Sequence, residues 1–313
     1  MKILVTGVAG QLGHDVMNEL FKRGIDATGS DVAAGYSGIR DGSPVETMPY
    51  VSMDITDETK VERVFAEVCP DAVIHCAAWT AVDLAEDEDK RERVFAINER
   101  GTANIAKEAG RSNARIMYIS TDYVFDGQGE KPWEADCREY APLNVYGESK
   151  LRGEKAVISA AERFFIVRIA WVFGKNGNNF IKTMLNVGKT HDKLKVVCDQ
   201  IGTPTYTYDL ARLLADMIQS EKYGYYHATN EGGFISWYDF AVEIFRQATE
   251  MGIGDYSAER LLVEPVTTAE YGISKAVRPL NSRLDKSKLA QAGFRPLPVW
   301  QDAVKRYLEE IEG

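Results

Sequence analysis

The glycine-rich turn near the N-terminus constrains the fold of this chain more than any other stretch. Residues 2–6 form a short, β-branched apolar run, which is typical of a buried parallel strand. The turn follows directly, and residues 16–23 then have the apolar spacing of an amphipathic helix. This order predicts a site where a pyrophosphate binds at the helix N-terminus. An ordinary turn with incidental glycines is the alternative, but the spacing of Gly7, Gly10 and Gly13 favours the phosphate site.

The next predicted strand, residues 26–30, ends at Asp31. An acidic side chain at this position accepts hydrogen bonds from the adenosine ribose hydroxyls and repels a 2′-phosphate, which favours NADH over NADPH. Arg40 lies nearby in the irregular stretch 32–49 and would offset that repulsion. The alternative interpretation of Asp31 is a turn residue at the end of a strand.

Further strands and helices alternate after this point. Asp54 ends the strand predicted over 51–55, where it either holds an adenine amino group or caps the helix predicted over 57–68. The strand predicted over 72–78 contains His75, which we interpret as a core histidine because it lies in mid-strand. The small residues at the end of this strand, Ala77 and Ala78, allow the backbone to approach a cofactor closely.

The same alternation continues through the first 170 residues and predicts an α/β fold, a Rossmann-type doubly wound parallel sheet with ligands at the carboxyl ends of the strands. We expect the acidic segment 83–90 to be solvated. The division is then a nucleotide-binding domain over 1–170 and a smaller α/β substrate lobe over 171–313, with some lobe segments returning to the sheet. The remaining predicted helices are 94–111, 146–161, 180–189, 209–219, 237–251 and 299–311, and the remaining strands are 115–120, 164–169, 194–197 and 225–228.

Tyr146 and Lys150 are four residues apart, so on a helix both side chains lie on one face, one turn apart. An ammonium beside a phenol stabilises the phenolate and lowers the tyrosine pKa. A tyrosine so tuned can exchange a proton with a carbonyl or alcohol oxygen. By itself such a pair is common on solvated helices, and the dinucleotide site upstream is what gives it weight.

These motifs occur in an order that resembles the extended short-chain dehydrogenase/reductase family. The glycine turn, the Ala77–Ala78 strand end, Thr121 at another strand end and the Tyr146–Lys150 pair all fall at one edge of the predicted sheet. Within that family, the chain resembles the dTDP-4-dehydrorhamnose reductases over essentially its whole length. Six segments carry this second resemblance: 120–127, 131–134, 142–147, 177–180, 199–205 and 278–284.

The resemblance implies a reaction and a role for each matching residue. The reaction is reduction of the 4-keto group of dTDP-4-dehydro-L-rhamnose by NADPH or NADH. Thr121 would hydrogen-bond the carbonyl oxygen, Tyr146 would protonate it, and Lys150 would hold the nicotinamide ribose and lower the tyrosine pKa. The implied cofactor-binding residues are Gly7, Gly10, Gln11, Leu12, Gly13, Asp31, Asp54, Ile55, Ala77, Ala78, Trp79, Thr80, Tyr146 and Lys150.

The implied substrate-side positions are Asp122 and Trp171. We add Asn179 and Arg283, which could meet the sugar or the diphosphate, because guanidinium groups suit phosphate oxygens. Lys182 could join them or lie at the surface, and we expect Phe173 to pack in the core. The sugar-nucleotide dehydratases of this fold follow their threonine with Asp-Glu, whereas this chain has Asp122-Tyr123. The second carboxylate needed for eliminating water is therefore absent.

Two alternatives stay open. One is another nucleotide-sugar reductase or epimerase of the same fold. The other is a non-catalytic NADP-binding protein of the kind that regulates methionine adenosyltransferase. The intact Thr121, Tyr146 and Lys150 favour an enzyme.

The net charge of −10 argues against a nucleic-acid or anionic-membrane partner. No stretch approaches the length of a membrane span. The four cysteines are scattered, without a Cys-x-x-Cys pair or a histidine cluster, so we expect no disulfide framework and no zinc site, and a cytoplasmic location. We predict a monomer or homodimer without a metal in the active site; Mg²⁺ at a dimer interface is implied by the resemblance alone.

Overall fold

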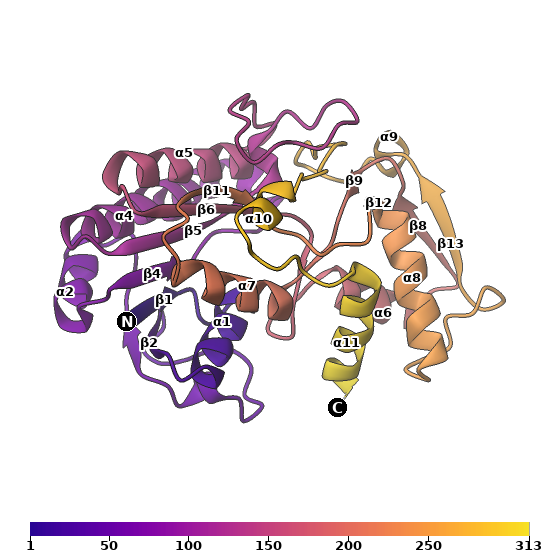
Figure 1. The fold of residues 1–313 in the computed structure, drawn as a ribbon. Coiled ribbons are helices and arrows are strands. Elements are labelled where there is room, and N and C mark those ends of the chain that lie inside the picture. Colours follow the sequence, from indigo (N-terminus) through magenta and orange to yellow (C-terminus); the bar gives the residue numbers. More distant parts are fainter. Residues whose placement is uncertain (313) are drawn as a thin grey trace.

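The computed structural model describes residues 1–312, and a seven-stranded parallel sheet forms its centre (Figure 1). The strands lie in the order β11-β6-β5-β4-β1-β2-β3, and every neighbouring pair is parallel. The strand order reverses between β1 and β4, which is where ligands bind in open α/β sheets. The bounds are β1 (Lys2–Thr6), β2 (Asp26–Asp31), β3 (Tyr50–Ser52), β4 (Ala72–His75), β5 (Arg115–Thr121), β6 (Phe164–Ile169) and β11 (Gly224–His227).

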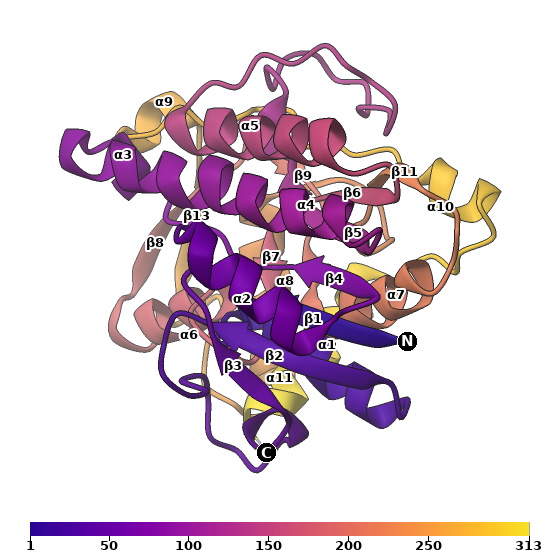
Figure 2. The same ribbon diagram turned by 90° about the vertical axis from the view of Figure 1, so that its left-hand side faces the viewer.

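Helices cover both faces of this sheet, as Figures 1 and 2 show from two sides. On one face, α1 (Gln11–Lys22) and α7 (Thr207–Ile218) bury Val16 and Leu214 against strand residues such as Ile3. The other face is covered by α2 (Glu58–Val68), α4 (Thr102–Arg111) and α5 (Val145–Ala160). Because both faces are buried, the central strands β1, β4, β5 and β6 are largely apolar runs, and this explains why they could be predicted from the sequence.

Helix α1 begins at Gln11, five residues before the predicted start at residue 16. Its first turn contains polar residues that are nevertheless buried: His14 is 2% exposed and Asp15 is 6% exposed. His14 exchanges a hydrogen bond with the Tyr36 hydroxyl, and Asp15 accepts one from the Thr207 hydroxyl. The apolar pattern could not reveal this turn, because segments distant in sequence satisfy its polar groups.

The helix predicted over 94–111 begins earlier and is continuous through three parts. These are α3 (Glu88–Phe95), a π-helical segment (Ala96–Gly101) and α4. Only Val94 of α3 is buried, so its first turns carry no apolar pattern. The wider π-turn carries the fully buried Asn98, and such turns often mark functional sites. The acidic segment 83–90 is exposed or half-buried as expected, apart from the buried Ala85, and its last three residues begin α3.

The C-terminal half contributes a second, smaller core to the right of the sheet in Figure 1. The aromatic side chains of Phe173, Phe240, Trp300 and Tyr307 dominate it; Phe173 is 1% exposed, which confirms its predicted core position. Its helices are α6 (Phe180–Thr190), α8 (Trp237–Glu250) and α11 (Trp300–Glu312), with the short α9 (Thr268–Tyr271). The short α10 (Ser287–Gln291) instead buries Leu289 in the core of the central sheet. Its strand pairs are β8 (Lys193–Val197) with β13 (Leu262–Val266), β7 (Val172–Phe173) with β10 (Thr205–Tyr206), and β9 (Ile201–Gly202) with β12 (Ile235–Ser236).

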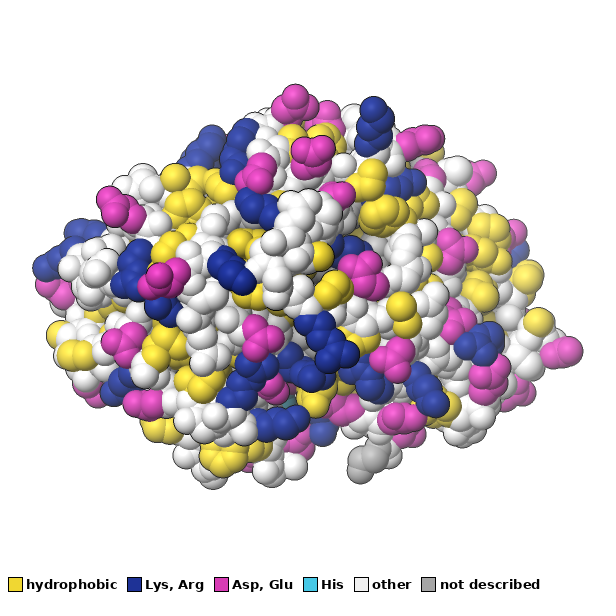
Figure 3. Space-filling view, in the orientation of Figure 1, with side chains coloured by type: hydrophobic (Ala, Val, Ile, Leu, Met, Phe, Trp, Pro, Cys, Tyr) yellow, Lys and Arg dark blue, Asp and Glu magenta, His cyan; other side chains and the backbone are white. Residues whose placement is uncertain are grey.

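The strand predicted over 225–228 is β11, and it joins the central sheet beside β6. Acidic and basic side chains are interspersed over the face drawn in Figure 3. Within residues 1–312, no helix is long and apolar enough to cross a membrane, and no group of three or more His, Cys, Asp or Glu side chains could hold a metal ion. The four cysteines are free thiols.

Candidate active site

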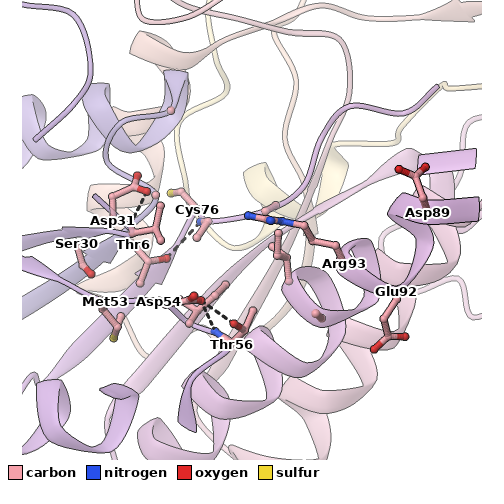
Figure 4. Close-up of a pocket in the computed structure, with 18 residues that line it drawn as sticks. Thr6, Ser30, Asp31, Met53, Asp54, Thr56, Cys76, Asp89, Glu92 and Arg93 are labelled. Carbon is pink, nitrogen blue, oxygen red and sulfur yellow. Dashed lines mark hydrogen bonds between the residues drawn. The ribbon is translucent and has the colours of Figure 1, made fainter. Parts of the chain in front are cut away.

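A cavity of about 680 Å³ opens at the carboxyl ends of β1, β2 and β4, where the strand order reverses. Figure 4 shows Thr6, Asp31 and Cys76 on one side of it, with Arg93 extending toward it from α3. Of the residues predicted to bind the cofactor, this cavity brings together Gly7, Gly10, Asp31, Asp54, Ile55, Ala77 and Ala78.

The glycine loop fits a close approach of a dinucleotide backbone. Gly7 has φ of +72°, and a Cβ there would lie 2.6 Å from the backbone nitrogen of Ala77. A Cβ on Gly13 would collide with the Gly7 carbonyl group. The Gly10 amide donates to the Gly7 oxygen at 3.0 Å, which closes the turn at the start of α1. Gln11, Leu12 and Gly13 begin α1 without lining the cavity.

Two acidic side chains flank the adenosine end of this cavity. One Asp31 carboxylate oxygen accepts from the Ala9 amide at 3.0 Å, so this side chain supports the glycine loop as well as lining the cavity. Asp54 accepts from the Thr56 amide and hydroxyl, and these bonds lower the pKa of its carboxyl group. The N-cap of α2 is Asp57, so the interpretation of Asp54 as the cap was wrong.

The end of β4 is held by an amide that sequence reasoning missed. Asn98 accepts from the Trp79 amide at 2.8 Å and donates to the Trp79 carbonyl oxygen and to the Ser149 hydroxyl on α5. Trp79 and the exposed Thr80 do not line the cavity. His75 is satisfied by the hydroxyls of Thr6 and Thr102, as the core interpretation predicted. The π-helical turn marks Asn98 as a candidate functional residue, and this turn is visible only in the structure.

The three residues predicted to be catalytic lie on two adjacent elements. Thr121 ends β5, and Tyr146 and Lys150 lie on α5, whose N-cap Asn144 accepts from the Gly147 amide at 2.8 Å. Burial raises the pKa of the Tyr146 phenol, while a hydrogen bond with Thr121 acts in the opposite direction. The expected lowering of this pKa by Lys150 is not found: burial is the largest influence on the phenol, and Lys150 is not among the groups that shift its pKa.

Lys150 is 2% exposed, and its ammonium lies 4.1 Å from the centre of the Tyr118 ring. Burial lowers its pKa to about 7, against the attraction of Glu154. The lysine charge in turn influences the thiol of Cys76, which lines the cofactor cavity. Lys150 therefore lies close to the wall of the cavity that Cys76 forms.

The predicted substrate-side residues have more varied settings. Asp122 is buried, accepts from the Thr121 hydroxyl at 2.9 Å, and has its pKa raised to about 6 by burial. Trp171 has φ of +51°, a strained conformation for a non-glycine residue, and stacks on Trp237 at 3.8 Å. Asn179 caps α6 and donates to Gln11, Gly174 and Tyr307, so its amide is used within the protein.

Arg283 donates to the Asn281 side chain at 3.0 Å and forms no salt bridge with any described residue. Lys182 donates to the carbonyl oxygens of Lys175 and Gly177, so its ammonium is likewise occupied locally.

A segment that we call the strap, residues 272–280, connects the C-terminal half to the start of α5. Arg278 forms a salt bridge with Asp83 at 2.6 Å, and Lys275 forms one with Asp87 at 2.7 Å. The side-chain amide of Asn144 donates to the backbone carbonyl oxygen of Val277 at 2.8 Å. Sequence reasoning missed the strap contacts, because the pair Arg278–Asp83 is separated by 195 residues and neither residue carries a local signal.

Comparison with known proteins agrees with this arrangement. The family model described as the RmlD substrate binding domain matches residues 1–312. A dTDP-4-dehydrorhamnose reductase of Aggregatibacter actinomycetemcomitans is 38% identical over 97% of both chains. Among solved structures, a dTDP-4-dehydrorhamnose reductase of Clostridium acetobutylicum superposes with a TM-score of 0.87 at 40% identity, covering 100% of both chains.

The dTDP-4-dehydrorhamnose reductase of Bacillus anthracis, solved in complex with NADP, has a TM-score of 0.84 at 36% identity over 99% of both chains. Likeness at this level of identity extends through both the nucleotide end and the C-terminal half. The chain therefore belongs to the RmlD family, together with these dTDP-4-dehydrorhamnose reductases.

Proposed function

We propose that this protein reduces the 4-keto group of dTDP-4-dehydro-L-rhamnose, giving dTDP-L-rhamnose, the last step in making that nucleotide sugar. The observation that carries the proposal is the set formed by the buried Thr121 and Lys150 and the half-buried Tyr146 on β5 and α5. Strand β5 lies beside β4, and the residues that follow β4 line the cavity. Family membership supplies the sugar nucleotide, because the relatives are named for it.

The reaction adds a hydride to the carbonyl carbon and a proton to its oxygen. A bound nicotinamide cofactor supplies the hydride. Thr121, whose hydroxyl donates to Asp122 in the free protein, turns that hydroxyl to the carbonyl oxygen when substrate binds and orients it toward the phenol. Tyr146 gives its proton to that oxygen as negative charge develops there. Burial, which raises the pKa of the free phenol, keeps Tyr146 protonated and ready to donate at neutral pH.

The Lys150 ammonium holds the nicotinamide ribose and stabilises the tyrosine phenolate left after proton transfer. The glycine loop holds the pyrophosphate through backbone amides at the start of α1. By the resemblance to the family, Asp122 and Trp171 contact the sugar. We infer a cytoplasmic location, where nicotinamide cofactors and nucleotide sugars are available.

We further propose that NADH is preferred over NADPH. The Asp31 carboxylate lines the cavity at the end of β2, where it accepts hydrogen bonds from ribose hydroxyls and repels a 2′-phosphate. Arg40 does not line the cavity; its guanidinium donates to the Tyr36 carbonyl oxygen at 3.2 Å and lies 3.9 Å from the Glu46 carboxylate.

The test is loss of nicotinamide absorbance at 340 nm, a wavelength set by the cofactor itself, at about neutral pH. Purified protein is mixed with enzymatically generated dTDP-4-dehydro-L-rhamnose and with NADH or NADPH in parallel. The proposal requires oxidation that depends on the sugar nucleotide, and faster oxidation of NADH. Folded protein that binds either cofactor without oxidising it would refute the reductase and favour an epimerase or a regulatory protein.

A further inference from the structure

Lys150 has to be positively charged for its proposed role, yet its surroundings oppose that charge. The side chain is 2% exposed, its ammonium faces the ring of Tyr118, and it forms no salt bridge with any described residue. Burial lowers its pKa to about 7. At neutral pH, a small further loss of stabilising charge would therefore leave the amine largely neutral.

The titratable groups that face Lys150 come from three elements, and most of them are neutral near pH 7. At the end of β4, burial lowers the pKa of His75 to about 3 and raises that of Cys76 to about 12. Burial also raises the pKa values of Tyr118 on β5 and Tyr146 on α5. The carboxylate of Glu154, one turn beyond Lys150 on α5, is the remaining group, and it raises the pKa of the lysine.

Glu154 is held in place by a buried network. One carboxylate oxygen accepts from the Ser120 hydroxyl at 2.6 Å and from Arg168 Nε at 2.8 Å, and the other accepts from Arg168 Nη2 at 2.8 Å. Glu154 is 1% exposed and Arg168 is 0% exposed. Two parallel hydrogen bonds from a guanidinium fix both the position and the ionised form of a carboxylate.

The partners of Glu154 also connect it to the reacting end. Ser120 directly precedes Thr121 on β5, and Arg168 comes from the neighbouring β6. On its other side, Arg168 donates to the Tyr140 hydroxyl at 2.8 Å and to the Ala135 oxygen at 3.3 Å. Burying such an ion pair contributes little to stability by itself, because desolvation offsets the attraction between the charges. The pair also ties α5 to β6 and to the segment 135–140, and its carboxylate lies one helical turn from Lys150.

We propose that Glu154 is a positioning residue that raises the protonated fraction of Lys150 near neutral pH, and that Arg168 and Ser120 hold the carboxylate in place for this purpose. This inference rests on the proposed function only in that Lys150 contacts the cofactor ribose.

The test follows NADH affinity by cofactor fluorescence from pH 5.5 to 9 in wild type, Glu154→Gln and Glu154→Asp. Affinity should fall as pH rises through the lysine pKa, because the neutral amine donates more weakly. Glu154→Gln should shift this fall to lower pH by about one unit, the scale expected for a buried charge nearby. Glu154→Asp keeps the charge and should return the profile most of the way to that of wild type. Superimposable profiles for wild type and Glu154→Gln would overturn the proposal.

Glu154→Gln leaves Arg168 buried without its anion and can therefore unfold the protein. The double variant Glu154→Gln/Arg168→Met removes both charges and serves as the second test. If Glu154 acts on Lys150, the double variant keeps the shifted profile. A return to the wild-type profile would mean that Glu154 only balances the charge of Arg168 and does not act on Lys150. This result would overturn the proposal.

The pH profile of NADH oxidation with the sugar nucleotide provides the link to catalysis. In Glu154→Gln, kcat at pH 7.5 should fall on the order of tenfold, matching the shift of about one unit, with the sugar-nucleotide KM within about twofold. If wild type binds NADH with the expected pH dependence but does not oxidise it, the proposed function fails while the inference stands. If wild type is active and Glu154→Gln has an unchanged profile, only the inference fails.

Discussion

The proposed active site has two ends, the cofactor cavity and the set of proposed catalytic residues, and they are built in different ways. At the nucleotide end, the backbone of the glycine loop and the strand ends Asp31 and Ala77 line an open cavity. At the reacting end, the side chains of Tyr146 and Lys150 are desolvated, and burial is the largest influence on both pKa values. The nucleotide end therefore depends on local backbone shape, whereas the reacting end depends on what the rest of the fold packs around it.

The largest effect that we expect comes from the reacting end. Tyr146→Phe removes the proton donor and should lower kcat by a factor on the order of 10² or more. NADH affinity should stay within about twofold, because the phenol hydroxyl contributes little to holding the dinucleotide. Steady-state oxidation at 340 nm and fluorescence titration measure the two quantities. Tyr208→Phe, at an exposed tyrosine on α7, is the control, and an undiminished kcat in Tyr146→Phe would remove this residue from the acid role.

The second-largest effect should fall on NADH binding at the nucleotide end rather than on the chemical step. Gly13→Ala places a methyl group against the Gly7 carbonyl and must shift the loop. We expect NADH affinity to fall by on the order of tenfold or more, and the free energy of unfolding to drop by about 1–3 kcal/mol. Titration with NADH and thermal melts measure these changes. Gly35→Ala, where a Cβ meets no atom within 4 Å, is the matched control. Equal behaviour of the two variants would contradict a tightly built loop.

A third change tests electrostatics at the nucleotide end without disturbing its shape. Asp31→Asn keeps an oxygen that can accept from the Ala9 amide but removes the negative charge. The ratio of kcat/KM for NADPH to that for NADH should rise by about tenfold, and less at high salt, where charges are screened. Asp26→Asn, at the exposed start of the same strand, should leave the ratio unchanged. A constant ratio in Asp31→Asn would assign the cofactor preference to other residues.

The smallest effect concerns the strap across the reacting end. Asp83→Ala removes the partner of Arg278 and the acceptor for the amides of Lys275 and Ala276. Because the pair is partly exposed, its loss is worth only about 1 kcal/mol, so KM for the sugar nucleotide should rise by a few-fold. NADH affinity should not change. Glu264→Ala, which breaks an exposed salt bridge with Lys193 on the paired strands β8 and β13, is the control. A change in NADH affinity in Asp83→Ala would show that the two ends are coupled.

Several parts of the fold could be predicted from the sequence, and the reason differs from element to element. Strands β1, β5 and β6 were predicted almost to the residue, because strands buried on both faces are continuous apolar runs. The start of α1 was missed, because His14 and Asp15 are polar and find their partners far along the chain. The π-turn at Asn98 was missed for a similar reason, since no local pattern distinguishes it from an ordinary helix.

The sequence by itself determined the order of strands and helices, the glycine loop and the four-residue spacing of Tyr146 and Lys150. Each depends on neighbours within a few residues, whose spacing is fixed by backbone geometry. Only the tertiary structure decided the charge states of Tyr146 and Lys150, the engagement of Asn179 within the protein, and the salt bridges of the strap. Desolvation and ion pairing depend on which distant segments come together, and no local pattern in the chain encodes that.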